Sequence, residues 1–133
     1  MPVVRQIVYG TEWQRYYRSI RRQITARGPV PDVAWVSEER CSAARRIEGI
    51  LTERCWGDDF TFHPDDPYRV VGEWEVGDLS EVDALAEIGG DFGVHIDQDA
   101  IARLVEKGLT FGGFVDYVLN LQRRREASDD RHP

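Results

Sequence analysis

The chain has 133 residues, of which 41% are hydrophobic and 11% aromatic, and a formal net charge of −7. These values suit one domain with a modest core and exclude an intrinsically disordered chain. No apolar run approaches the roughly 20 residues that a membrane-spanning helix needs, and the N-terminus has no signal-peptide pattern, so we expect a cytoplasmic protein.

Charge is distributed unevenly along the chain. Residues 1–37 contain six arginines and two acidic residues, whereas residues 57–122 contain fifteen acidic and three basic residues. A nucleic acid or an anionic membrane would be repelled by this acidic part. We therefore expect binding to neither, unless the arginine-rich N-terminal region acts by itself.

Residues 1–36, here called the leader, are predicted to contain one helix over about residues 12–27. Thr11 and Gln14 have capping-box spacing, and Gly28 and two prolines follow the helix. An apolar stripe lies beside an arginine-rich face, and an isolated helix of this length is marginal in water. The stripe is formed by Trp13, Tyr17, Ile20 and Ile24. We expect it to dock on the chain's own acidic part or on that of a second copy.

Residues 37–122, here called the body, are predicted to contain four helices. Ser37, Asp78, Asp97 and Thr110 are the predicted N-caps. Between the first and second helices, residues 57–77 show no helical period and are predicted to form a long loop. The predicted fold is therefore an all-α four-helix bundle with an N-terminal helical extension, followed by a polar, disordered tail over residues 123–133.

Cysteine and histidine usage indicates neither a disulfide nor a metal site. Cys41 and Cys55 share the first predicted body helix, which separates them by roughly 21 Å, too far for a disulfide. The three histidines are scattered and lack ligand spacing. The motif HPDDP, residues 63–67, is predicted to be a turn.

Residues 79–118 resemble the second half of the acyl carrier protein family. In that family a helix of the form Leu-x-x-Val-x-x-Leu leads to Phe and then to Ile before an acidic or proline turn. The segment TFGGFVDYV resembles the family's last helix. The corresponding residues of the first pattern here are Leu79, Val82, Leu85, Phe92 and Ile96. Over residues 38–122 the resemblance implies a four-helix bundle with a long loop after its first helix.

The residue that carries the family's prosthetic group is missing from its expected place. Carriers attach phosphopantetheine to the serine of Asp-Ser-Leu at the start of the second helix. Here Gly77 and Asp78 precede Leu79 instead, and Ser80 lies two residues late. Since a carboxylate has no hydroxyl to take up the group, we expect no cofactor and interpret Asp78 as a helix cap. Attachment at Ser80 is the alternative.

The sequence offers no combination of nucleophile, base and orienting group, so we expect a protein that is not an enzyme. In carrier proteins the acidic second helix docks on basic patches of partner enzymes. The resemblance therefore implies partner binding by Glu81, Asp83, Glu87 and Asp91, whereas the alternative is a solvated face that maintains solubility.

These observations favour a non-enzymatic protein-binding module that has lost the prosthetic group. Its partner would be a basic protein, its own leader or a second copy in a homodimer. Two alternatives are a genuine carrier loaded at Ser80 and a nucleic-acid or membrane-surface binder acting through the arginine-rich helix.

Overall fold

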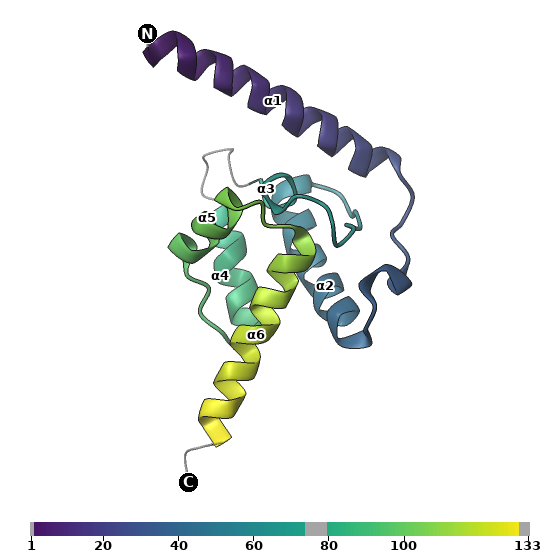
Figure 1. Cartoon of the computed structure of the whole chain (residues 1–133). Helices are drawn as coiled ribbons and strands as arrows, with labels where there is room; N and C mark the ends of the chain where they lie inside the picture. Colours follow the sequence, from purple (N-terminus) through teal and green to yellow (C-terminus); the bar gives the residue numbers. More distant parts are fainter. Residues whose placement is uncertain (1, 74–79, 131–133) are drawn as a thin grey trace.

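The structure, a computed structural model, describes the backbone of residues 2–73 and 80–130 and the side chains of residues 12–73 and 82–128. The described part is all-α, as predicted, and its only β-type contact is an isolated bridge between Pro67 and Thr110. A bundle of helices has one long helix lying across one end (Figure 1). None of the described helices has the length and hydropathy that crossing a bilayer requires.

The leader forms a longer helix than predicted. Helix α1 spans Pro2–Ala26, so Thr11 lies inside it and does not cap it. A start at Pro2 suits proline, which is favoured at the first helical position, although Gly10 and the β-branched residues Val3, Val4, Ile7 and Val8 lower the helix propensity of the first half. The segment after α1, residues 27–36, here called the linker, contains the 3₁₀ turn η1, Asp32–Trp35, with Trp35 fully buried.

The body contains the four predicted helices. Helix α2 spans Glu38–Leu51 and continues as the π-helical turn η2, Thr52–Trp56. Helix α4 spans Ser80–Phe92, α5 spans Gln98–Glu106 and α6 spans Phe111–Asp130.

Three of the four predicted caps are confirmed. The side chain of Ser37 accepts a hydrogen bond from the Arg40 N–H at 3.2 Å, and that of Asp97 accepts one from the Asp99 N–H at 3.1 Å. The Thr110 hydroxyl accepts a hydrogen bond from the Gly113 N–H at 3.0 Å. The fourth predicted cap, Asp78, lies outside the described residues.

Two other predictions were wrong. The loop over residues 57–77 contains a short helix, α3, Tyr68–Val71, which is too brief to give a periodic signal. The tail was predicted to be disordered because it is polar, but α6 continues to Asp130. Its residues RRREA are good helix formers, and after Gly113 no glycine or proline occurs before the helix ends.

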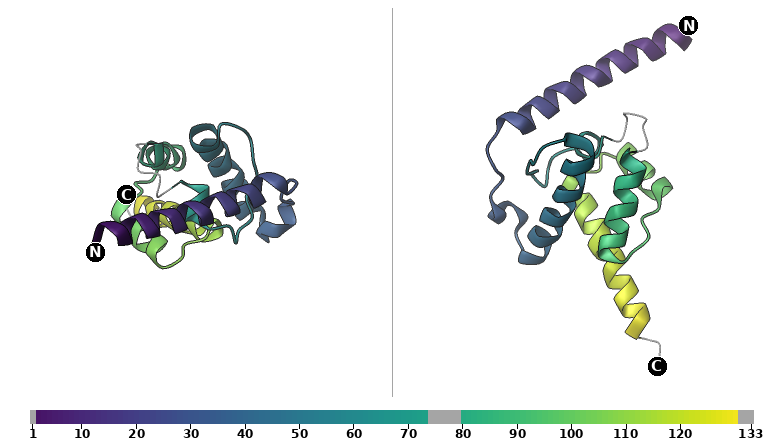
Figure 2. Two further views of the ribbon diagram at one scale, coloured as in Figure 1. Left: turned by 90° about the horizontal axis from the view of Figure 1, so that it is seen from above. Right: turned by 180° about the vertical axis from the view of Figure 1, so that it is seen from behind.

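Helices α2, α4 and α6 pack against one another in pairs, and α3 lies between α1 and α6. Viewed from above, α1 passes over the end of the bundle, while the far end of α6 projects away from the body (Figures 1 and 2). This arrangement leaves α1 with one face toward the body and the other toward solvent.

The core joins residues of the leader, such as Ile24 and Trp35, to residues of the body. Most of the apolar residues that recur at helical spacing in the body are buried, among them Ile47, Leu51, Leu85, Ile88, Phe92, Ile96, Ile101, Phe111, Val115 and Val118. Val82 and Leu104 are only half-buried, with Val105 buried beside Leu104, and Leu79 lies outside the described residues. The segment between η2 and α4, here called the connection, also contributes the buried residues Phe62, Val70 and Val71.

In the structure the leader packs against its own body. Ile24 is only 2% exposed, and Trp13, Tyr17 and Ile20 pack partly buried against the core. The Tyr17 hydroxyl donates to the Glu73 carboxylate at 2.7 Å. Arg21 pairs with the same carboxylate and stacks 4.0 Å from the centroid of the Trp56 ring.

Burial of the ring and the hydrogen bond to Glu73 raise the pKa of Tyr17 from 10.0 to about 12. Because this pKa is higher in the folded state, the contribution of Tyr17 to stability is present below about pH 10 and is lost as the pH rises toward 12.

Replacing the buried Leu85 by alanine tests the packing of α4. Leu85 is 4% exposed, so Leu85→Ala should lower the free energy of unfolding by about 2–5 kcal/mol in chemical denaturation. The control Asp83→Ala, at an exposed position of the same helix, should change it by less than about 0.5 kcal/mol. If both substitutions changed the free energy of unfolding by less than about 0.5 kcal/mol, Leu85 would not be buried, and α4 would pack with another face toward the core.

Alkaline pH tests the docking of α1. The wild type should be more stable than Tyr17→Phe near neutral pH, and this advantage should decrease between about pH 8 and about pH 11 as the unfolded tyrosine loses its proton. Denaturation of both proteins at the two pH values measures the difference. If the difference in the free energy of unfolding between the two proteins were the same at both pH values, Glu73 would not hold the Tyr17 hydroxyl.

Candidate functional site: charged faces and the cleft below helix α1

The acidic residues predicted for partner binding lie on the exposed side of α4. Asp83, Glu87 and Asp91 are exposed, and the side chain of Glu81 lies outside the described residues. Two of these carboxylates already face arginines of the first body helix and its extension. Glu87 accepts from Arg54 at 3.0 Å, and Asp91 accepts from the Nε of Arg46 at 3.0 Å.

These two ion pairs are solvent-exposed and therefore weak. The four side chains retain 38–45% of their accessible surface. Pairs of this kind contribute about 0–1 kcal/mol, so an incoming partner can replace an arginine beside Glu87 or Asp91 at little cost. Arg46 is also held by the Asp91 carbonyl, to which it donates at 2.9 Å, and by the Phe92 ring, whose centroid lies 4.0 Å from its guanidinium. The arginines come from the body and not from the leader, so α2 and α4 together present a face that carries both signs of charge.

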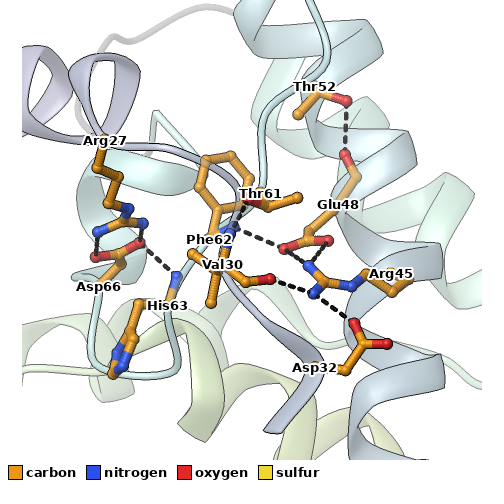
Figure 3. A network of polar contacts seen from close by, with 10 residues as sticks. All are labelled: Arg27, Val30, Asp32, Arg45, Glu48, Thr52, Thr61, Phe62, His63 and Asp66. Atoms are coloured by element: carbon orange, nitrogen blue, oxygen red, sulfur yellow. Dashed lines mark hydrogen bonds and ion pairs between the residues drawn. The ribbon is translucent and has the colours of Figure 1, made fainter. Parts of the chain in front are cut away.

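A second group of ionic contacts is centred on two buried carboxylates, Glu48 and Asp66, and joins the leader to the body (Figure 3). Glu48 is 4% exposed and accepts a hydrogen bond from the Phe62 N–H at 2.7 Å. Its other partner, Arg45, also donates to the Val30 carbonyl at 2.7 Å and to Asp32 at 2.9 Å. Burial raises the pKa of Glu48, while the hydrogen bonds from Phe62 and Arg45 act in the opposite direction. This network links α2, the connection and the linker.

The HPDDP motif forms the predicted turn, and one of its acids has a structural role. The Asp66 N–H donates to the His63 carbonyl at 3.0 Å. The Asp66 carboxylate in turn accepts from the His63 N–H at 2.8 Å and pairs with Arg27 at the end of the leader (Figure 3). The side chain of Asp65, in contrast, is 89% exposed. Within the described residues, no group of three ligand side chains is placed to hold a metal ion.

A cleft of about 970 Å³ lies below α1. Its walls come from α1 residues 12–16, from the connection around residues 65–69 and from the turn between α5 and α6 at residues 105–110. A smaller cleft of about 550 Å³ runs between α4 and residues 94–99. Val82, Leu85 and Ile96 form its apolar side, and His95, Asp97, Gln98 and Asp99 form its polar side.

Three arginines of α1 point away from the body. Arg15, Arg18 and Arg22 are exposed, and their spacing places them on one side of the helix, opposite the docked stripe. In the described part of the chain none of the three has a carboxylate partner. They are the residues on which the nucleic-acid or membrane alternative would depend.

Several of these features could not be recognised in the sequence. Glu48 and Asp66 resemble surface acids, because their N–H donors come from Phe62 and His63 in the irregular connection. The arginines that pair with α4 lie in residues 38–56, where four acidic and four basic residues balance, so no excess of positive charge marks them in the sequence. No sequence pattern indicated the cleft, whose three walls are far apart along the chain.

Comparison of the chain with protein-family models, with curated proteins and with solved structures finds no match. The chain's own residues are therefore the basis on which its function is inferred.

Proposed function

We propose that this chain is a non-enzymatic protein-binding module with a scaffold of the acyl carrier type and no prosthetic group. The order of its body helices supports the scaffold. A long helix α2 is followed by a long connection, the 13-residue helix α4, the 9-residue helix α5 and the longer helix α6. The core positions named by the resemblance, such as Leu85, Phe92 and Ile96, are buried.

The observation that carries the proposed function is the exposed charged face shared by α2 and α4. Asp83, Glu87 and Asp91 lie along α4, and the weak pairs with Arg46 and Arg54 leave their carboxylates available for exchange. A basic protein patch would take over the carboxylates, and neighbouring acids of the same partner would receive the two arginines. A protein surface carries both signs of charge, whereas nucleic acids and anionic membranes carry predominantly one, so this face favours a protein partner.

The second candidate function is a carrier loaded at Ser80. The observation in its favour is the smaller cleft beside α4, whose lining combines apolar residues such as Val82 and Val94 with polar ones such as His95 and Asp99. Ser80 is the first residue of α4. The position that corresponds to the family's attachment serine is occupied by Asp78, which lies outside the described residues.

Co-expression with a broad-specificity phosphopantetheinyl transferase distinguishes the two functions. The intact mass of the wild type should not increase, because Asp78 offers no hydroxyl. The variant Gly77→Asp, Asp78→Ser restores the family's attachment sequence and should gain the mass of one phosphopantetheine. A gain in the wild type that Ser80→Ala abolishes would contradict the proposal, and a double variant that stays unloaded would contradict the carrier-type scaffold.

Affinity capture tests binding at the α2–α4 face. A partner that the intact chain captures from an extract should be lost with the charge-reversed variant Asp83→Lys, Glu87→Lys, Asp91→Lys. The control Asp58→Lys, Asp59→Lys reverses exposed acids in the connection and should retain it. The same proteins captured by all three chains would show that this face does not select a partner.

A further inference from the structure

We propose that the cleft below α1 binds a partner segment in which an arginine or lysine stands beside apolar residues. The cleft is separate from the α2–α4 face, so this proposal does not rest on the function proposed above. Its volume of about 970 Å³ falls at the upper end of the range typical for binding sites, which is about 300–1,000 Å³. Since it is also open to solvent, an extended segment of a few residues fits it better than an enclosed small molecule.

The apolar part of the cleft contains aromatic side chains that are incompletely covered. The large side chain of Tyr16 is 45% exposed. The centroid of its ring lies 5.6 Å from that of the Trp13 ring. Pro67 and Leu109, both half-buried, extend this surface on the body side. Covering these side chains would remove apolar area from water, which favours a complex.

The charged part of the cleft is predominantly acidic. Glu12, Asp65 and Glu106 line it and are exposed, whereas Arg69 is the basic residue among the described lining residues. These three carboxylates come from all three walls. A cation seated in the cleft would therefore approach negative charge from several sides, and a carboxylate or phosphate would be repelled.

The chain itself shows that the aromatic wall accepts a guanidinium. The Arg69 guanidinium lies 4.0 Å from the centroid of the Trp13 ring, a cation–π arrangement. Tyr16 offers a further ring beside it, within reach of the acidic rim. A second arginine or lysine, supplied by a partner, would combine ring contact with ionic attraction, and apolar neighbours on the partner would contact Pro67 and Leu109.

The test uses the intact protein labelled with 5-fluorotryptophan and ¹⁹F NMR, with the Trp13 signal assigned from Trp13→Phe. The probe is an end-capped hexapeptide of alternating leucine and arginine, and the matched control peptide has citrulline in place of arginine. The arginine peptide should shift the Trp13 signal in a saturable way. The citrulline peptide should bind at least about tenfold more weakly, because it lacks the charge that the rim and rings attract.

Matched variants locate the site. Glu12→Gln, Glu106→Gln should weaken binding of the arginine peptide about tenfold, whereas Asp58→Asn, Asp59→Asn should leave it unchanged. The charge-reversed α4 variant should also bind as the wild type does, which separates this result from the function proposed above. Equal affinity for the two peptides, absence of a Trp13 shift, or loss of binding only with the α4 variant would each overturn the proposal. A self-associated protein whose dimer blocks the peptide would also overturn it, by showing that a second copy is the occupant.

Discussion

The placement of the leader depends on a carboxylate that has been removed from water. Glu48 of α2 is almost fully buried, and burying such a group without partners is very unfavourable. Its partners are the Phe62 N–H and Arg45, and Arg45 also binds the Val30 carbonyl of the linker. The Arg45–Glu48 pair therefore holds α2, the connection and the linker together. Asp66 also ties the residue after α1 to the connection, because its carboxylate accepts from the His63 N–H of its own turn and pairs with Arg27.

The binding surfaces follow from that placement. With its end held by Arg27, α1 lies over α3 and presents Trp13 and Tyr16 toward the turn between α5 and α6, which creates the cleft. The acidic residues of the chain consequently serve two different purposes. Buried ones such as Glu48 hold the fold together, while exposed ones such as Asp83 and Glu106 remain available to a partner. The mixed charges of the α2–α4 face and the acidic, aromatic cleft both suit a protein ligand.

The features that could be predicted from the sequence are those encoded locally. Ser37 and Thr110 identify helix starts because a cap bonds within its own first turn, and Leu85 and Ile88 identify a buried face through helical spacing. The buried role of Glu48 and the Arg46–Asp91 pair could not be predicted, because each depends on which distant segments meet. Polarity was a poor guide at the C-terminus, where residues 123–130 are helical despite their charge.

Helix α1 is an integral part of the fold and not a separate appendage. Amide hydrogen exchange on the intact protein tests this most directly, because it reports local opening residue by residue. The amides in the docked half of α1, residues 14–26, should exchange far more slowly than those of a peptide of the same sequence, and Tyr17→Phe should accelerate their exchange selectively. Exchange at the rate of the peptide, with the amides of α2 and α6 still protected, would contradict the account.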